Sequence, residues 1–201
     1  MKNDTITLAM TGASGAPYGF RLLQCLLEAG QNVHLLISSA AQVVINTETD
    51  HQLGGNPNEI SRYLHDLYQP NPSQLTVFGK SQWMAPIASG SNASKAMVVC
   101  PCSSATLSSI ARGSSTDLIE RAADVILKEQ RKLILVTREM PLSVIHLENM
   151  LSLAKLGVAI LPASPGFYHK PEKIEDLVDF VVARILDHLT IEHNLTPPWG
   201  A

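Results

Sequence analysis

The chain of 201 residues contains few charges: Asp, Glu, Lys and Arg make up 16% of it, whereas apolar residues make up 45%. So little charge leaves much of the surface apolar, which favours burial in an oligomer over a lone monomer. The net charge of −3 provides no basic field that would hold nucleic acid. We therefore expect a homo-oligomer without a nucleic-acid partner.

The chain also lacks the features of secreted, membrane-bound and metal-binding proteins. No apolar run approaches the length of a membrane span, and the first residues show no signal-peptide pattern. Cys25, Cys100 and Cys102 are too few for a disulfide framework, and the spacing of the last two fits neither a redox pair nor a zinc knuckle. No histidine pairs with an acidic residue at metal-ligand spacing, so no metal site is predicted. These absences predict a cytoplasmic protein with reduced thiols.

Short apolar runs alternate with amphipathic segments along the chain, and its length fits a single domain over residues 1–201. This alternation predicts an α/β fold with a doubly wound, mostly parallel sheet in a three-layer, Rossmann-like or flavodoxin-like arrangement. We expect strands at residues 6–10, 33–37, 76–78, 96–100, 132–137 and 158–161. We expect helices that end at about 29 and 112, and helices at 40–47, 59–67, 118–130, 143–156 and 174–189.

The segment at about 51–75 differs from the rest of the chain. It is polar and is punctuated by Gly54, Gly55, Pro57, Pro70 and Pro72. The apolar strand pattern resumes beyond it, so we interpret the segment as a variable insertion over the sheet rather than as a linker.

The first strand breaks at Gly12 and turns directly into the first helix. A glycine-broken turn at a helix start leaves backbone N–H groups unpaired and so makes an anion site, to which the Ser14 hydroxyl adds a hydrogen bond. The dinucleotide fingerprint fails because Ser14 and Pro17 stand where it needs glycines, and the serine-hydrolase elbow fails at Ala16. The alternative is a tight turn whose small residues serve packing alone.

Hydroxyl side chains follow several of the expected strands. Ser14 follows the first strand, Ser38 the second and a cluster at 103–106 the fourth, while Arg138 and Glu139 follow the fifth. Ligands of doubly wound sheets gather at such strand ends, where hydroxyls, helix N-termini and one guanidinium suit a single phosphate with a polyol tail. FMN therefore fits better than a dinucleotide, and Ser38 in the place of the usual acidic residue also argues against NAD. The alternative is that the hydroxyls are helix caps. That interpretation explains each hydroxyl by itself but does not explain why they share one location.

Few side chains are candidates for acid–base or phosphate chemistry. Glu139 would serve as a general acid or base if it is shielded at its strand end, and Glu48 is a weaker candidate by position alone. Tyr168, on a proline-bounded loop, is either a wall residue or a phosphate donor. Four basic side chains are, taken singly, more often solvated charges than ligands: Arg121, Lys128, Arg138 and Arg184.

Several blocks of sequence, in order along nearly the whole chain, resemble the flavin prenyltransferases of the UbiX family, formerly described as aromatic acid decarboxylases. The blocks are Thr-Gly-Ala-Ser-Gly-Ala-x-Tyr-Gly at 11–19, Glu48-Thr49-Asp50, Cys-Pro-Cys-Ser at 100–103, Leu-Ile-Glu-Arg-Ala-Ala-Asp-Val at 118–125, and Arg138-Glu139-x-Pro141 with Pro165-Gly-Phe-Tyr-His169. Residues 51–95 carry the least of the resemblance.

The resemblance implies a reaction that composition and spacing do not reveal. Members of that family join a dimethylallyl group from dimethylallyl monophosphate to reduced FMN at N5 and C6, without a metal. The product, prenylated FMN, serves partner decarboxylases of the UbiD type, and the pathway served is either ubiquinone biosynthesis or the breakdown of aromatic acids. The resemblance also implies a homododecamer.

The resemblance further implies roles for individual residues. Glu48 and Glu139 are the implied proton-transfer groups, and Ser14 stands with them. Lys128, Tyr168, Arg184 and Arg121 would hold the prenyl phosphate across a subunit boundary, and Trp83 would form a wall beside the prenyl tail. The residues implied to hold FMN are Gly12, Ala13, Ser14, Ser38, Ser103, Ser104, Ala105, Thr106 and Arg138.

Two other functions stay open at this point. FMN-dependent decarboxylases of cysteine-ended substrates share the flavin fold, but their catalytic histidine has no place here. A non-catalytic flavin carrier would bind FMN in a way that prenyl phosphate does not change. A prenyl-phosphate site made by Lys128, Tyr168 and Arg184 distinguishes prenyl transfer from both.

Overall fold

The computed structural model describes residues 4–197 and 200 and contains one six-stranded sheet in which every strand pair is parallel. The strand order is β3-β2-β1-β4-β5-β6. This arrangement confirms the predicted doubly wound sheet. The strands are β1 (Thr5–Met10), β2 (Asn32–Ile37), β3 (Leu75–Phe78), β4 (Ala96–Cys102), β5 (Lys132–Thr137) and β6 (Ala159–Ile160).

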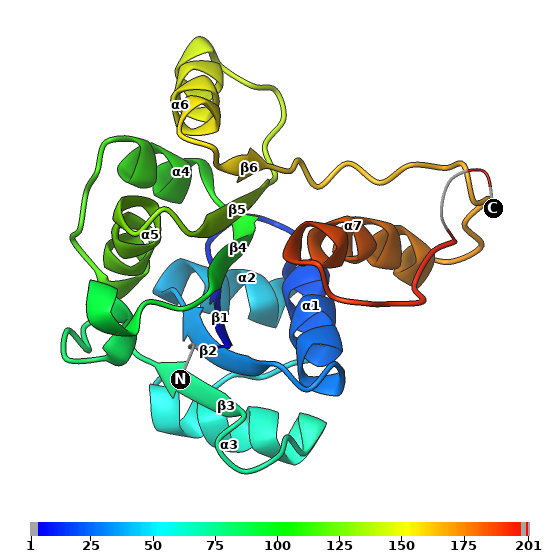
Figure 1. Cartoon of the computed structure of the whole chain (residues 1–201). Coiled ribbons are helices and arrows are strands. Elements are labelled where there is room, and N and C mark those ends of the chain that lie inside the picture. Colours follow the sequence, from blue (N-terminus) through cyan, green and yellow to red (C-terminus); the bar gives the residue numbers. More distant parts are fainter. Residues whose placement is uncertain (1–3, 198–199, 201) are drawn as a thin grey trace.

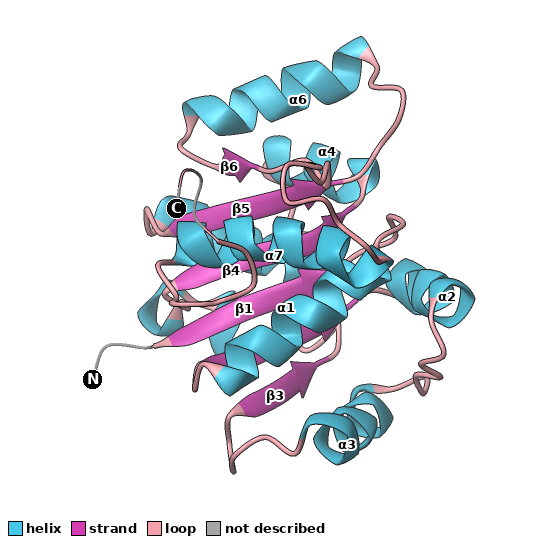
Figure 2. Ribbon diagram, turned by 90° about the vertical axis from the view of Figure 1, so that its right-hand side faces the viewer, coloured by secondary structure: helices cyan, strands magenta, loops and turns pink. Residues whose placement is uncertain are grey.

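Helices cover both faces of the sheet, as Figures 1 and 2 show. The helices α1 and α7 lie side by side on one face, while α4 and α5 cover the other face and α6 packs on α4. None of the described helices is long and apolar enough to span a membrane. The helices are α1 (Ala16–Glu28), α2 (Ser39–Glu48), α3 (Pro57–Tyr68), α4 (Ser104–Ala111), α5 (Leu118–Lys128), α6 (Val144–Lys155) and α7 (Ile174–Leu189).

The strands are apolar because both of their faces are buried, as parallel sheets require. All six residues of β1 are buried: Leu8 points into the core under α1 and α7, and its neighbour Ala9 points into the core under α4 and α5. Side chains alternate between the faces of a strand, so a continuous apolar run supplies both cores at once. Leu26 of α1 and Val182 of α7 are fully buried against the first of these cores.

Residues 51–75 contain α3 and lead into β3, the strand at one edge of the sheet, against which α3 packs. That this segment is a variable insertion stays a prediction. The helix predicted at 118–130 ends two residues earlier, at Lys128. The reason is backbone geometry: Gln130 has a φ of 53°, the left-handed conformation in which an α-helix does not continue.

The sheet changes direction between β1 and β4. From β1 the chain winds outward through β2 and β3, and from β4 it winds the other way through β5 and β6. At such a switch point the connections leave the carboxyl ends of the two central strands in opposite directions, and the crevice between them is where doubly wound sheets bind ligands. We call the edge where the strands end the carboxyl edge, and the edge where they begin the amino edge.

Thr11 fixes the two turns at the switch point to each other. Its backbone N–H and its hydroxyl both donate to the carbonyl oxygen of Pro101, at 3.1 and 2.9 Å, and its hydroxyl accepts from the Ser103 N–H at 2.8 Å. These bonds join the loop after β1 to the end of β4 and to the start of the loop that follows it. The start of α1 and the start of α4 therefore keep one relative position.

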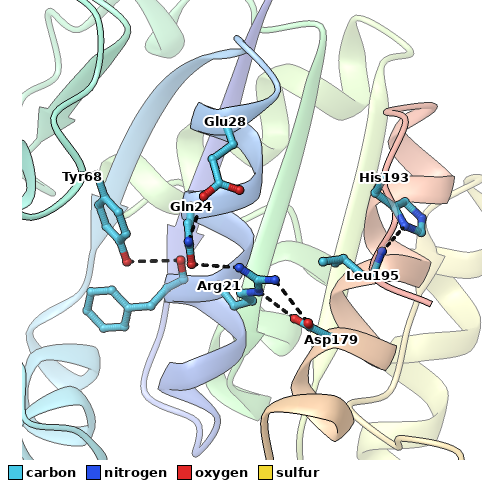
Figure 3. Close-up of polar contacts among 8 residues, drawn as sticks. Arg21, Gln24, Glu28, Tyr68, Asp179, His193 and Leu195 are labelled. Carbon is cyan, nitrogen blue, oxygen red and sulfur yellow. Dashed lines mark hydrogen bonds and ion pairs between the residues drawn. The ribbon is translucent and has the colours of Figure 1, made fainter. Parts of the chain in front are cut away.

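An ion pair ties α7 to α1. The Nε and Nη2 atoms of Arg21 donate to the two carboxylate oxygens of Asp179, at 2.6 and 3.2 Å, and Nη1 donates to Gln24 (Figure 3). Figure 3 also shows the Tyr68 hydroxyl of α3 donating to a backbone carbonyl of α1. A bidentate pair of this kind fixes orientation as well as distance. It adds an oriented polar contact to the apolar packing of α7 on the core.

Candidate active site

The start of α1 holds an anion that belongs to the chain itself. The N–H groups of Gly15 and Ala16 donate to Oε2 of Glu48, the last residue of α2, at 2.8 and 2.9 Å, and the Ser14 hydroxyl donates to the same carboxylate. Gly15 has a φ of 121°, which glycine adopts without strain. The predicted anion site is therefore present, but we correct its occupant: these two donors are used by Glu48 and do not point at a free ligand.

Glu48 is kept ionised by its partners. Partial burial raises its pKa, but the hydrogen bonds from Ser14, Gly15 and Ala16 and the positive charge of Arg138 together bring the pKa below its usual range. Glu48 is thus a carboxylate at neutral pH. The structure places Ser14, Glu48 and Arg138 within reach of one another, although sequence position alone made Glu48 only a weak candidate.

Packing explains part of the glycine turn, as the alternative interpretation required. A Cβ atom on Gly12 would stand 2.6 Å from the Cβ of Ala40 in α2. The start of α2 can therefore lie this close to residue 12 only because that residue is a glycine. The Ser38 hydroxyl caps α2, accepting from the Ala41 N–H at 3.0 Å, and the Ser38 N–H donates to the carbonyl of Met10 at 3.0 Å. Both interpretations therefore hold here: the hydroxyl is a cap, and it lies at the carboxyl edge.

The start of α4 has backbone donors that none of the described residues uses. The Ser103 hydroxyl caps the helix, accepting from the Thr106 N–H at 3.3 Å, and lies 3.0 Å from the Thr106 hydroxyl. The first-turn N–H groups of Ser104 and Ala105 have no helical partner. A helix start with free N–H groups and two hydroxyls attracts an anion. This helix, rather than α1, offers the open anion position at the switch point.

Glu139 follows β5 and accepts a hydrogen bond from the Ser104 hydroxyl at 2.6 Å. Its pKa is lowered, first by this bond, then by the Met140 N–H and by the charges of Arg138 and His146. Its carboxylate is exposed. The sequence-based condition that Glu139 be shielded is therefore not met within the described chain, although β5 itself is buried as far as its last residue, Thr137.

The basic residues predicted to hold a prenyl phosphate lie elsewhere in the chain. Lys128 ends α5 only four residues before β5 begins, which places it near the amino edge, and its Nζ pairs with Glu129 at 2.6 Å. Arg121, also on α5, donates to the Ala88 carbonyl at 3.0 Å and pairs with Asp124. Trp83 precedes this region and is about half exposed, at 47%.

Tyr168 and Arg184 lie on the opposite face of the sheet from α5. They line a hollow of about 1070 Å³ between α7, the loop at 168–169 and the chain after α7. The end of α7 reaches the amino edge, because Lys132, the first residue of β5, donates from Nζ to the His188 carbonyl. One chain thus brings the predicted flavin residues together but separates Lys128 from Tyr168 and Arg184.

The profile of the Flavoprotein family matches residues 1–186. The flavin prenyltransferase UbiX of Pseudomonas aeruginosa is 58% identical over 197 residues, which are 98% of this chain and 94% of that protein. The chain belongs to the UbiX flavin prenyltransferases. As a member of that family it is a prenyltransferase, which confirms the resemblance carried by those sequence blocks.

Solved structures of UbiX proteins have the same fold. A dodecameric FMN-dependent UbiX-like decarboxylase from Escherichia coli O157:H7 superposes with a TM-score of 0.87 at 42% identity, covering 98% of this chain and all of that one. AnUbiX, in complex with FMN and dimethylallyl pyrophosphate, has a TM-score of 0.87 at 39% identity and covers all of this chain and 99% of that one. A PPC decarboxylase at 18% identity and a TM-score of 0.58 shares the fold alone.

Two residues of this UbiX chain escaped the sequence-based prediction. Asp187 and His193 line the same hollow as Arg184, and Asp187 pairs with Arg184 at 2.6 Å. The three-residue spacing of Arg184 and Asp187 on a helix is a signal for such a pair. His193 gives no signal in the sequence, because only the fold of the chain beyond α7 brings it to Asp187.

Proposed function

We propose that this prenyltransferase joins the dimethylallyl group of dimethylallyl monophosphate to reduced FMN at N5 and C6, making prenylated FMN for a UbiD-type decarboxylase. The observation that supports this best is the gathering of Ser14, Glu48 and Arg138 at the switch point of a UbiX-family sheet. When bound, reduced FMN supplies the nucleophilic ring atoms. The chain supplies binding, orientation and proton transfer.

The residues at the carboxyl edge fit FMN. Since Glu48 uses the donors at the start of α1, we assign the phosphate end of the cofactor to the open start of α4, with the hydroxyls of Ser103 and Thr106 beside it. Arg138 adds a guanidinium at the same edge. The remaining residues assigned to FMN are Gly12, Ala13, Ser14, Ser38, Ser104 and Ala105.

Two carboxylates are placed for proton transfer. Glu48 and Glu139 both have lowered pKa values, so each is ionised at neutral pH and accepts rather than donates a proton at the start of the reaction. Glu48 reaches the switch point through the Ser14 hydroxyl, which bonds to its carboxylate. We assign proton transfer to these three residues.

The prenyl phosphate needs cations and a dry aromatic pocket. A leaving phosphate is stabilised by positive charge and an allylic cation by aromatic faces. We assign the phosphate to Lys128, Arg121, Tyr168 and Arg184, and the prenyl tail to Trp83. Because one chain separates these residues, the complete site requires neighbouring subunits.

Exposed apolar side chains support such an assembly. Met140 is 85% exposed, and Val144, Ile145 and Leu151 of α6 are also largely exposed. Apolar surface of this extent usually meets a partner. Together with the dodecameric Escherichia coli relative, this surface supports a homododecamer as the working form.

The three cysteines support a cytoplasmic site of action. Cys25, Cys100 and Cys102 are all free and buried, as in proteins that work among reduced thiols.

The experiment that tests the function uses the full chain. It is incubated without oxygen with reduced FMN and dimethylallyl monophosphate, and the extracted flavin is analysed by mass spectrometry. We expect a gain of one five-carbon unit. Bound but unaltered flavin would contradict prenyl transfer, and a parallel incubation with peptides ending in cysteine would then separate the decarboxylase from the carrier.

A further inference from the structure

Asp187 occupies an unusual position for a carboxylate, since it lines the hollow in which Arg184 is assigned to a phosphate. Both of its oxygens are used. Oδ2 accepts from Nη1 of Arg184 at 2.6 Å, and Oδ1 accepts from Nε2 of His193 at 3.0 Å. Arg184 spends only Nη1 on this pair, so within the described chain its Nε and Nη2 have no partner.

The chain beyond α7 fixes the tautomer of His193. The Leu195 N–H donates to Nδ1 of His193 at 3.4 Å, a contact that Figure 3 shows. A neutral ring that accepts at Nδ1 carries its proton at Nε2, the atom that faces Asp187. The ring is well covered, with 13% of its side chain exposed, whereas the side chains of Arg184 and Asp187 are 58% and 46% exposed. His193 is therefore the anchored end of the chain of contacts.

We propose that Asp187 and His193 are positioning residues that hold the Arg184 guanidinium in place for the phosphate of the prenyl donor. The contacts run from the Leu195 backbone through His193 and Asp187 to Arg184. This inference rests on the proposed function, in which Arg184 binds that phosphate.

Charge alone does not explain the arrangement. Asp187 and Glu192 put two carboxylates into the lining of the hollow, and Arg184 is the one permanent cation among the described residues that line it. Extra negative charge weakens the binding of a phosphate. An arginine whose rotamers are already restricted, however, loses less conformational entropy when it binds. The Asp187 carboxylate thus contributes by restricting the Arg184 guanidinium, which lowers the entropy cost of phosphate binding.

The test measures steady-state prenylation with dimethylallyl monophosphate and, separately, the Kd for FMN and the melting temperature of each variant. We expect Asp187→Ala and His193→Ala each to raise KM for the monophosphate about fivefold, as for an exposed ion pair, with kcat and the FMN Kd nearly unchanged. His193→Gln keeps a donor close to the position of Nε2 and should restore most of the wild-type KM.

His188→Ala is the matched control. His188 is exposed at the end of the same helix and is absent from the lining of the hollow. The KM of the His188→Ala variant for the monophosphate should therefore equal that of the wild type. A double variant sharpens the test: His193→Ala should add nothing to Asp187→Ala, because both act on Arg184 along one path.

Two outcomes would overturn the inference. A lower KM in Asp187→Ala would mean that Asp187 acts as a repelling charge, and an unchanged KM would mean that the contacts only hold the C-terminal segment.

One more measurement separates this inference from the proposed function. The equilibrium Kd for dimethylallyl monophosphate is measured without turnover. A wild type that binds it but leaves the flavin unaltered would contradict prenyl transfer, and the Kd ratios of the variants would still decide the positioning role. A wild type that does not bind it would overturn both.

Discussion

The carboxyl edge at β1 and β4 and the hollow beside α7 differ in how completely one chain builds them. At the carboxyl edge Glu48 is held by two backbone N–H groups and by Ser14, and Thr11 joins the two turns through hydrogen bonds. Beside α7, Arg184 and Asp187 form an exposed pair, and Tyr168 is 71% exposed. Backbone donors at fixed turns need no partner chain, whereas long side chains on a helix surface depend on contacts with other side chains to hold their positions.

The largest effect is expected at the carboxyl edge. Glu48→Gln keeps an oxygen for the N–H groups of Gly15 and Ala16 but removes the base, so prenylation should slow by about 10²–10⁴-fold. Single-turnover mass spectrometry of the flavin measures this. Full activity in a folded variant would remove Glu48 from the chemistry, and Glu48→Ala serves as the comparison in which the helix start also loses its partner.

Substitutions in the hollow should weaken the use of the prenyl phosphate and leave the affinity for FMN unchanged. Arg184→Ala and Tyr168→Phe are expected to bind FMN as before but to lose turnover with prenyl phosphate by about 10-fold or more. The first variant lacks the guanidinium and the second lacks the hydroxyl that would contact the phosphate. FMN titration of each variant checks the retained cofactor binding, and steady-state kinetics check the loss of turnover. Collapse of FMN binding would show that the division into two regions is wrong.

Acid should weaken the carboxyl edge in a defined direction. The pKa of Glu48 is lower in the folded chain than the value of about 4.3 expected when unfolded, so its contribution is complete above that value and is lost as the pH falls through the folded pKa. The free energy of unfolding should therefore exceed that of Glu48→Gln at pH 7. The difference should shrink towards pH 3 in urea titrations, and a difference constant with pH would argue against the bonds at the start of α1.

The smallest effect is expected where α7 meets α1. Asp179→Asn breaks the bidentate pair with Arg21, whose side chains are 23% and 29% exposed. The loss should be about 1 kcal/mol, or about 2–4 °C in melting temperature for a chain of this size. Calorimetry measures it, with Asp124→Asn, at a more exposed pair on α5, as the control. An equal loss of stability in both variants would mean that the pair between Arg21 and Asp179 stabilises the fold no more than an exposed pair within one helix.

Much of the fold could be predicted from the sequence because burial on both faces makes parallel strands apolar throughout. Within residues 4–197 and 200, the six strands and seven α-helices lie near their predicted positions and differ from them at their ends, as at Gln130, where one left-handed residue ends a helix. The short 3₁₀ helices Pro86–Ala88 and Gly90–Asn92 were not predicted. Ser14, Ser38 and the 103–106 cluster were placed correctly at one edge. That prediction worked because parallel strands all end on the same side of a sheet.

The sequence by itself determined the family, the α/β architecture and the residues that gather at the carboxyl edge. Only the tertiary structure decided that Glu48, from the far end of α2, takes the anion position at the start of α1, and that Lys128 lies apart from Tyr168 and Arg184. It also decided the contacts from His193 to Arg184. The physical reason is that periodicity and turn residues report local conformation, whereas these contacts depend on where helices distant in the sequence pack, which no local pattern encodes.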